Sequence, residues 1–169
     1  MELWDLYDEN RALTGKTLVR GQKIPEDSYH IVVNAWIRNS RGQYLISQRS
    51  ADRPDFPLLW ECVGGSALAG EDSLTAILRE IKEEVGLDFS PEDGNLAYSV
   101  IRKVINGLRY GDFLDVWLFE YDGPVDLSKA TTAEVAQTKW MTVDEIRTLF
   151  DEKKFVYTLE YFFDEIVGK

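Results

Sequence analysis

Three glutamates, Glu80, Glu83 and Glu84, stand at a spacing that a helix brings onto one of its sides. Residues three and four apart are neighbours on a helix surface, where like charges repel by roughly 0.3 kcal/mol per pair. A sequence selected only for helix stability would place lysines among them. Clustered carboxylate oxygens are the ligands that Mg²⁺ or Mn²⁺ takes in proteins. The spacing therefore indicates a divalent metal site, and a solvated acidic helix face is the alternative.

The segment that carries these glutamates predicts a helix. Residues 72–85 contain no proline or glycine, so about four helical turns are expected. Gly86 is a typical left-handed helix stop. An apolar stripe lies roughly 100° around the helix from the glutamates. The stripe consists of Leu74, Ile77, Leu78, Ile81 and Val85.

The same stretch resembles the Nudix box. Gly65 is followed after five residues by Glu71 and, after seven more, by residues 79–87, which read Arg-Glu-Ile-Lys-Glu-Glu-Val-Gly-Leu. Residues 65–87 match each fixed position of the box with no gap and no substitution. The resemblance implies a Nudix fold, an α/β/α sandwich. Its loop–helix–loop binds a divalent metal and hydrolyses a diphosphate that is linked to another moiety.

The chemistry assigns roles within the box. Diphosphate hydrolysis needs neutralised phosphate oxygens and an activated water, and carboxylates that hold Mg²⁺ serve both needs. We therefore expect Glu83 and Glu84 to be the principal metal ligands, with Glu80 a further ligand or the base that acts on water. In the family, a glycine carbonyl at the position of Gly65 can be a ligand. Arg79 completes the catalytic group by orienting the carboxylates rather than by contacting substrate.

Residues outside the box could add to the site. Asp115 or Glu134 would supply a further ligand or the base, and the sequence does not choose between them and Glu80. His30, the only histidine, stands at the start of a strand. A structural role for it competes with metal binding, which a histidine at the matching place performs in the isopentenyl-diphosphate isomerase branch of the superfamily.

Two arginines precede the box. Arg49 and Arg53 flank a loop that runs to Trp60. Near a metal site they would bind the outer phosphate of a substrate through charge-assisted hydrogen bonds. The alternative for both is a surface charge that serves solubility.

The N-terminal residues 2–20 predict a β-hairpin, since strand-like runs flank a polar stretch that contains glycine. The run WDLYDENRALTGKT is similar to the N-terminal hairpin of the isomerase branch. Isomerase chemistry in the family uses a cysteine just before the box glycine, where this chain has Gly64, and Cys62 lies two residues earlier. The box glutamates are also intact, as hydrolases keep them. Isopentenyl-diphosphate isomerisation is therefore the alternative to hydrolysis, and a catalytically silent binding module comes third.

Other segments predict the elements around the box. A capping box from Thr142 to Glu145 begins a helix to about Phe150, and aromatic residues spaced along 155–166 indicate a final amphipathic helix. Asn106-Gly107 predicts a type I′ hairpin turn. The order of elements indicates an α/β fold with a mixed β-sheet between helical layers. The expected strands are 30–38, 43–48, 61–63, 96–105, 108–121 and 134–141.

Length and charge limit the function classes. The length of 169 residues predicts a single domain, 1–169. The net charge of −11 argues against nucleic acid polymers and anionic membranes, and no apolar run of about 18 residues predicts a membrane span. Small phosphorylated substrates stay compatible, because bound Mg²⁺ supplies local positive charge. The acidic start, which lacks the pattern of a secretory signal, and the single Cys62 lead us to expect a cytoplasmic protein.

The non-phosphate half of the substrate is not readable from the box. A nucleoside di- or triphosphate derivative, as in a MutT-like pyrophosphohydrolase, is the first expectation, and an isoprenoid or other small diphosphate is the second. Trp36, Phe56, Trp60 and Trp117 could stack a base or line an apolar pocket, although core positions suit the strand residues better. The aromatic C-terminal segment makes a homodimer plausible.

Overall fold

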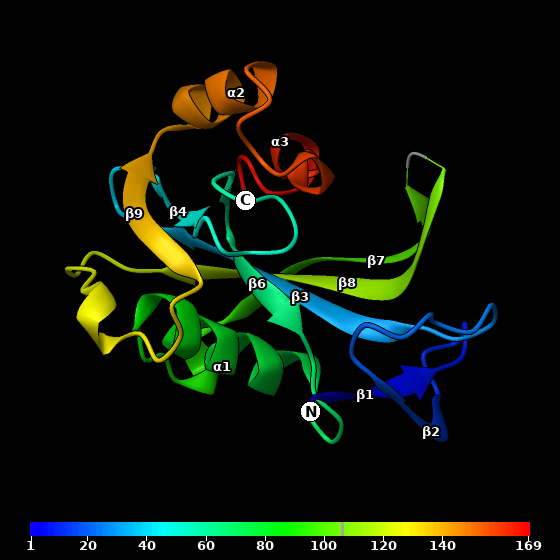
Figure 1. Ribbon diagram of the computed structural model, residues 1–169. Coiled ribbons are helices and arrows are strands. Elements are labelled where there is room, and N and C mark those ends of the chain that lie inside the picture. Colours follow the sequence, from blue (N-terminus) through cyan, green and yellow to red (C-terminus); the bar gives the residue numbers. More distant parts are fainter. Residues whose placement is uncertain (106) are drawn as a thin grey trace.

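The computed structural model describes residues 1–105 and 107–169, and a mixed β-sheet lies at its centre (Figure 1). The strands run in the order β5-β4-β3-β8-β7, with β6 paired to β3 and β9 paired to β4. β3 and β8 are parallel, and the other pairs in this sheet are antiparallel. The predicted turn at 106–107 includes a residue outside the described ranges. The bounds are β3 His30–Arg38, β4 Tyr44–Arg49, β5 Trp60–Glu61, β6 Val63–Ser66, β7 Asn95–Ile105, β8 Leu108–Glu120 and β9 Val135–Met141.

Helices cover both faces of the sheet, as expected for an α/β/α arrangement (Figure 1). Helix α1 (Ser73–Val85) packs on one face, and α2 (Val143–Asp151) and α3 (Phe162–Glu165) lie over the other. Because side chains alternate along a strand, neighbouring residues of β3 serve opposite cores. Val33 packs in the core with α1, whereas Trp36 packs in the core with α2 and α3.

The helix that carries the box begins and ends as its sequence predicts. The side chain of Asp72 caps its first turn by accepting a hydrogen bond of 2.7 Å from the Thr75 backbone N–H. Gly86 ends it at φ 70°, in the left-handed region. Ile77 and Ile81 are fully buried in the core. Short helical turns η1 (Pro91–Asp93) and η2 (Leu127–Lys129) lie in the connections that follow α1 and β8.

The C-terminal segment differs from the single amphipathic helix expected over 155–166. It forms a 3₁₀ turn η3 (Tyr157–Leu159) and the short α3. The start of the segment pairs with β5 instead: the Trp60 N–H donates to the Lys154 carbonyl, and the Val156 N–H donates to the Trp60 carbonyl, both at 2.9 Å. Backbone groups used in this pairing are not available to a helix.

The aromatic residues of that segment belong to the core. Phe162 is fully buried, and its ring stacks on Trp36 at a centroid distance of 4.0 Å. Phe155 is 2% exposed. These rings are therefore not a free surface for self-association. Within the described ranges, no helix combines the length and the hydropathy that a membrane crossing needs.

The N-terminal residues form a separate two-stranded sheet, with β1 (Leu3–Tyr7) antiparallel to β2 (Leu13–Val19). Backbone hydrogen bonds of 2.8 and 2.9 Å join Tyr7 to Tyr29, just before β3. The Trp4 ring stacks on His30 at 4.1 Å. These contacts fix the hairpin beside the central sheet.

Candidate active site

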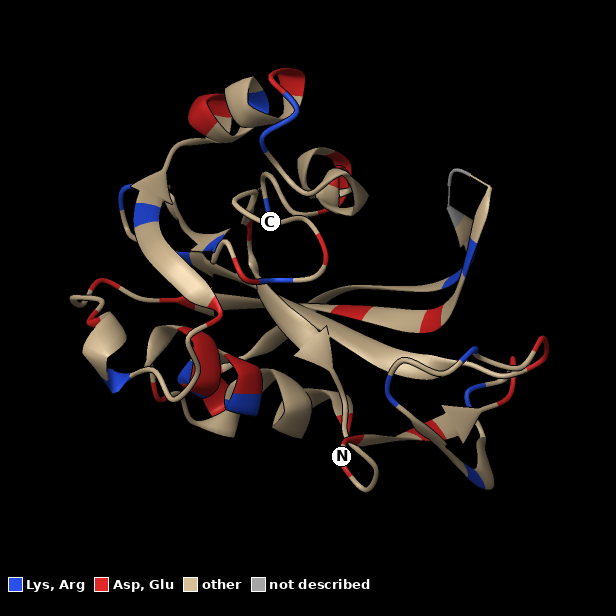
Figure 2. Ribbon diagram, viewed as in Figure 1, with Lys and Arg blue, Asp and Glu red and all other residues tan. Residues whose placement is uncertain are grey.

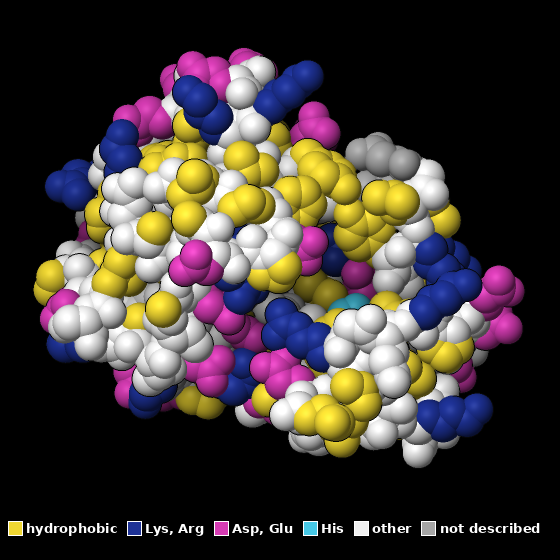
Figure 3. Space-filling model, viewed as in Figure 1, with side chains coloured by type: hydrophobic (Ala, Val, Ile, Leu, Met, Phe, Trp, Pro, Cys, Tyr) yellow, Lys and Arg dark blue, Asp and Glu magenta, His cyan; other side chains and the backbone are white. Residues whose placement is uncertain are grey.

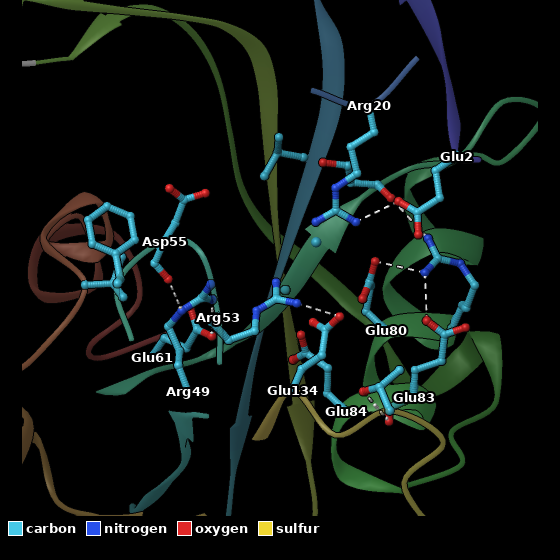
Figure 4. Close-up of a pocket in the computed structure, with 18 residues that line it drawn as sticks. Glu2, Arg20, Arg49, Arg53, Asp55, Glu61, Glu80, Glu83, Glu84 and Glu134 are labelled. Carbon is cyan, nitrogen blue, oxygen red and sulfur yellow. Dashed lines mark hydrogen bonds and ion pairs between the residues drawn. The ribbon is translucent and has the colours of Figure 1, made fainter. Parts of the chain in front are cut away.

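A cavity of about 420 Å³ opens between α1, β6 and the N-terminal hairpin. Figure 3 shows acidic and basic side chains on this face, beside a hollow in which the histidine is visible. Figure 2 shows acidic positions on α1. Ten charged residues that line it are labelled in Figure 4, and box glutamates lie at its centre. They are Glu2, Arg20, Arg49, Arg53, Asp55, Glu61, Glu80, Glu83, Glu84 and Glu134.

Glu84 is the most deeply buried of the box glutamates. Its side chain is 5% exposed, and its Oε2 atom has no hydrogen-bond partner. Burial raises the pKa of Glu84 well above its usual range, and the negative charges of Glu61, Glu80 and Glu134 raise it further. A buried carboxylate without a partner is costly. This position therefore suits a cation that would enter the cavity.

Arg79 joins the other carboxylates of the box. Its guanidinium donates to Glu80 at 2.8 Å and to Glu83 at 3.1 Å, and it pairs with both oxygens of Glu71 at 2.8 and 2.9 Å. Glu71 also accepts a hydrogen bond of 2.9 Å from the Leu68 N–H. Arg79 thus holds the box loop and orients two carboxylates at the cavity.

Burial also acts on Glu80, whose side chain is 13% exposed. Desolvation raises the pKa of Glu80 to about 7, against the opposing attraction of Arg79. A carboxyl group with a pKa near neutrality can both accept and release a proton at physiological pH. Glu83, at 35% exposed, is the most accessible of the three.

Two glycines of β6 let the chain approach the site closely. A Cβ atom on Gly65 would lie 2.1 Å from Oε1 of Glu80, so a larger residue would displace that carboxylate. A Cβ atom on Gly64 would lie 2.4 Å from the Asn34 side chain and 2.6 Å from the Val33 carbonyl. β6 therefore needs Gly65 to leave room for Glu80 in the site and Gly64 to leave room for β3 in the sheet.

The two arginines expected to bind phosphate both line the cavity, but they differ in the hydrogen bonds that they already make. Arg49 pairs with Glu61 at 2.7 Å, and its Nε donates to the Asp55 carbonyl at 2.9 Å. Arg53 pairs with Glu134 at 2.6 Å, and its buried Nε has no partner. Arg53 therefore has a buried donor without a partner, while Arg49 uses its Nε and Nη1 to hold the loop and Glu61.

Two residues considered for the site lie elsewhere. Asp115 is on the face of β8 that packs on α1, where it accepts hydrogen bonds from Arg11 and Ser99. His30 is stacked under Trp4 and is not among the cavity-lining residues. Of the alternatives outside the box, only Glu134 lines the cavity.

Four charged cavity residues were not expected from the sequence: Glu2, Arg20, Asp55 and Glu61. Glu61 could have been found, since it directly precedes the segment that enters the box glycines. Arg20 and Glu2 reach the cavity only because the N-terminal hairpin folds against the box loop, and no local spacing indicates this.

The donor set fits a divalent cation. Hard carboxylate oxygens of Glu80, Glu83 and Glu84 face one cavity, and the unpartnered Oε2 of Glu84 is the atom that most needs a positive charge. Among residues 1–105 and 107–169, no three acidic, histidine or cysteine side chains are already gathered closely enough to count as a formed metal site. Arg79 bridges Glu80 and Glu83 instead.

Comparisons with known proteins agree with this geometry. The chain matches the model of the NUDIX domain over residues 28–161. It is 37% identical over 166 residues to an uncharacterised Nudix hydrolase of Listeria innocua, covering 96% of this chain and 91% of that protein. It is 29% identical over 65 residues to an isopentenyl-diphosphate Delta-isomerase of Shigella flexneri, 38% of this chain and 36% of that enzyme. A crystal structure from Deinococcus radiodurans shares the fold, with a TM-score of 0.74 at 23% identity over 92% of both chains.

Proposed function

The chain belongs to the NUDIX domain family and is a Nudix-type hydrolase, and from this premise we propose that it cleaves a diphosphate bond with the help of Mg²⁺ or Mn²⁺. The substrate would be a small nucleoside-diphosphate-type or other organic diphosphate. One observation carries the proposal: an unpartnered, buried carboxylate oxygen of Glu84 faces the same cavity as Glu80, Glu83 and the arginines. A cation and a phosphate chain together would satisfy these groups.

Each residue of the site would have a distinct role in hydrolysis. A divalent cation, when bound, neutralises phosphate oxygens and makes water in the site more acidic. Glu83 and Glu84 would hold it, with Glu80 and the Gly65 carbonyl as further ligands. Arg79 keeps Glu80 and Glu83 in position, as its hydrogen bonds support. The free Nε of Arg53 would donate to a phosphate oxygen.

The proton acceptor for water is one of two carboxylates. Glu80 and Glu134 both line the cavity, whereas Asp115 lines a different cavity beside the start of α1. Glu134 already accepts from Arg53 at 2.6 Å, so a phosphate that draws Arg53 away would release it. We propose Glu80 or Glu134 for this step.

The isomerase alternative has less support. Cys62, the only cysteine, is 2% exposed and is not among the cavity-lining residues. Burial raises the pKa of its thiol well above the usual range, so the thiolate is disfavoured.

The single buried cysteine also supports a reducing compartment, and we propose that the protein is located in the cytoplasm.

Product analysis by liquid chromatography and mass spectrometry tests the proposed function. Purified protein with Mg²⁺ is offered nucleoside triphosphates, sugar nucleotides, dinucleotides and isopentenyl diphosphate. We expect a metal-dependent product with the mass of a cleaved diphosphate. A product of unchanged mass but altered retention, formed from isopentenyl diphosphate alone, would assign the isomerase reaction instead.

A further inference from the structure

The N-terminal hairpin places an arginine at the cavity, on the side away from Arg49 and Arg53. Figure 4 shows Arg20 and Glu2 on one side of the cavity and Arg53 with Glu61 on the other, with the box glutamates between them. The hairpin precedes residues 28–161, which match the family model. Membership of the family therefore does not by itself account for this arginine.

We propose that Arg20 is a substrate-binding residue that exchanges Glu2 for a phosphate group lying beyond the scissile diphosphate. The enzyme would then prefer a substrate with at least three linked phosphates, or a diphosphate whose other moiety carries a further phosphate. This inference rests on the proposed function.

The position of the hairpin is set by the box loop itself. The Leu3 carbonyl accepts from the Ala69 N–H, and the Asp5 carboxylate accepts from the Gly70 N–H, each at 2.7 Å. Ala69 and Gly70 belong to the loop that leads into α1. The Arg20 N–H in turn donates to the Glu2 carbonyl at 3.0 Å. The backbone of Arg20 is thus held relative to the metal-binding carboxylates.

The present partner of Arg20 is easily exchanged. Arg20 pairs with Glu2 at 2.6 Å, but the two side chains are 51% and 48% exposed. Exposed ion pairs contribute little to stability, whereas a guanidinium and a phosphate form stronger, charge-assisted hydrogen bonds. The pair of Arg49 and Glu61, at 13% and 17% exposed, is much less accessible to a ligand.

The charges around Arg20 also point to the cavity. The hydrogen bond to Glu2 is the main cause that raises the pKa of Arg20, and the carboxylates of Glu80 and Glu134 raise it as well. The guanidinium therefore faces the field of the box glutamates. An anion chain that begins at Arg53 and passes the metal carboxylates would end near Arg20.

Binding of inorganic phosphate chains tests this inference without catalysis. Isothermal titration in Mg²⁺ compares tripolyphosphate with pyrophosphate for the wild type, Arg20→Ala and Arg20→Lys. Arg38→Ala is the matched control, since Arg38 pairs with Glu120 away from the cavity. We expect Arg20→Ala to bind tripolyphosphate about tenfold more weakly than the wild type does. Its affinity for pyrophosphate, and the affinity of the control variant for both ligands, should change by less than about threefold.

Glu2→Gln should have the opposite effect on tripolyphosphate binding. Removing the competing carboxylate should tighten tripolyphosphate binding by about threefold and leave pyrophosphate unchanged. The inference is wrong if Arg20→Ala binds tripolyphosphate like the wild type, or if it weakens both ligands equally. A wild type that binds tripolyphosphate through Arg20 yet hydrolyses no diphosphate would overturn the proposed function and support the anion site.

Discussion

Two buried carboxylates line different cavities of the protein, and their surroundings differ. Asp115, 1% exposed, accepts hydrogen bonds from Arg11 at 2.8 Å and from Ser99 at 2.6 Å. Burial acts to raise the pKa of Asp115, but the hydrogen bonds from Arg11 and Ser99 outweigh it and hold that pKa below its usual range. Glu84, 5% exposed, has an oxygen without a partner, and burial raises its pKa.

The difference separates a structural acid from a functional one. Asp115 fixes the N-terminal hairpin to β8 through Arg11, and no further ligand is needed there. The charged form of Glu84 is not compensated by the protein alone. A buried acid whose partners are missing points to a cation that arrives from solution. The following substitutions separate the two cases.

The largest effect is expected for Glu84→Gln. Without this carboxylate, hydrolysis should fall by more than about 100-fold, because the cation loses a ligand. In metal-free buffer the same change should stabilise the protein by roughly 1 kcal/mol, since folding raises the pKa of this buried carboxyl group at a cost in free energy at neutral pH that glutamine avoids. Steady-state kinetics and urea unfolding measure the two effects.

Glu83→Gln is the matched control for that result. Its side chain is 35% exposed, so activity should fall similarly while the free energy of unfolding stays within about 0.5 kcal/mol. Near wild-type turnover in either variant would contradict the ligand assignment.

Asp115→Asn should show the reverse pattern. Breaking its pair with Arg11 leaves a guanidinium without its partner, and we expect a loss of about 2–3 kcal/mol in the free energy of unfolding. Because Asp115 lies away from the cavity, the turnover number should change by less than about threefold. Urea unfolding together with kinetics at saturating substrate checks both. A loss of activity in a stably folded variant would place Asp115 in the reaction.

His30 sharpens the comparison, because it too has an unpartnered buried atom, Nδ1, but lies outside the cavity lining. Burial lowers the pKa of His30 to about 4, and the charge of Arg102 adds to this. The unfolded chain therefore binds a proton that the folded protein does not, and stability falls as the pH drops below about 6.5. Between pH 7 and 5 this contributes about 2 kcal/mol.

His30→Phe, which keeps a ring against Trp4, is the variant for this measurement. The drop in unfolding free energy from pH 7 to pH 5 should be smaller than in the wild type by about 2 kcal/mol. An unchanged drop would show that folding does not lower the pKa of His30.

The smallest effect is expected at the glycines of β6. In Gly65→Ala, the new methyl group meets the movable end of Glu80, so activity should fall by about tenfold with little loss of stability. In Gly64→Ala, the methyl group meets the Val33 carbonyl, which the sheet holds in place, so stability should fall. Thermal unfolding and kinetics separate the two, and equal effects on activity would contradict this reading of β6.

The sequence predicted the helix of the box, its ends and the central strands, because periodicity and the capping residues act locally. It did not predict that Glu84 is buried more deeply than Glu80 and Glu83. Glu84 follows Ile81 by three residues and therefore shares the buried side of α1 with it. The position of Asp115 could not be predicted without the register of β8. The prediction of a single C-terminal helix was wrong because residues 154–156 pair with Trp60, a contact between segments far apart in the sequence. Arg20 depends on the docking of a separate hairpin.

Titration with Mn²⁺ of the wild type, Glu84→Gln and Asp115→Asn tests the central claim most directly. The account predicts that the wild type and Asp115→Asn bind the ion alike, and that Glu84→Gln binds it at least about tenfold more weakly. If Glu84→Gln bound Mn²⁺ as the wild type does, the unpartnered carboxylate would not be a metal ligand, and the proposed site would be wrong.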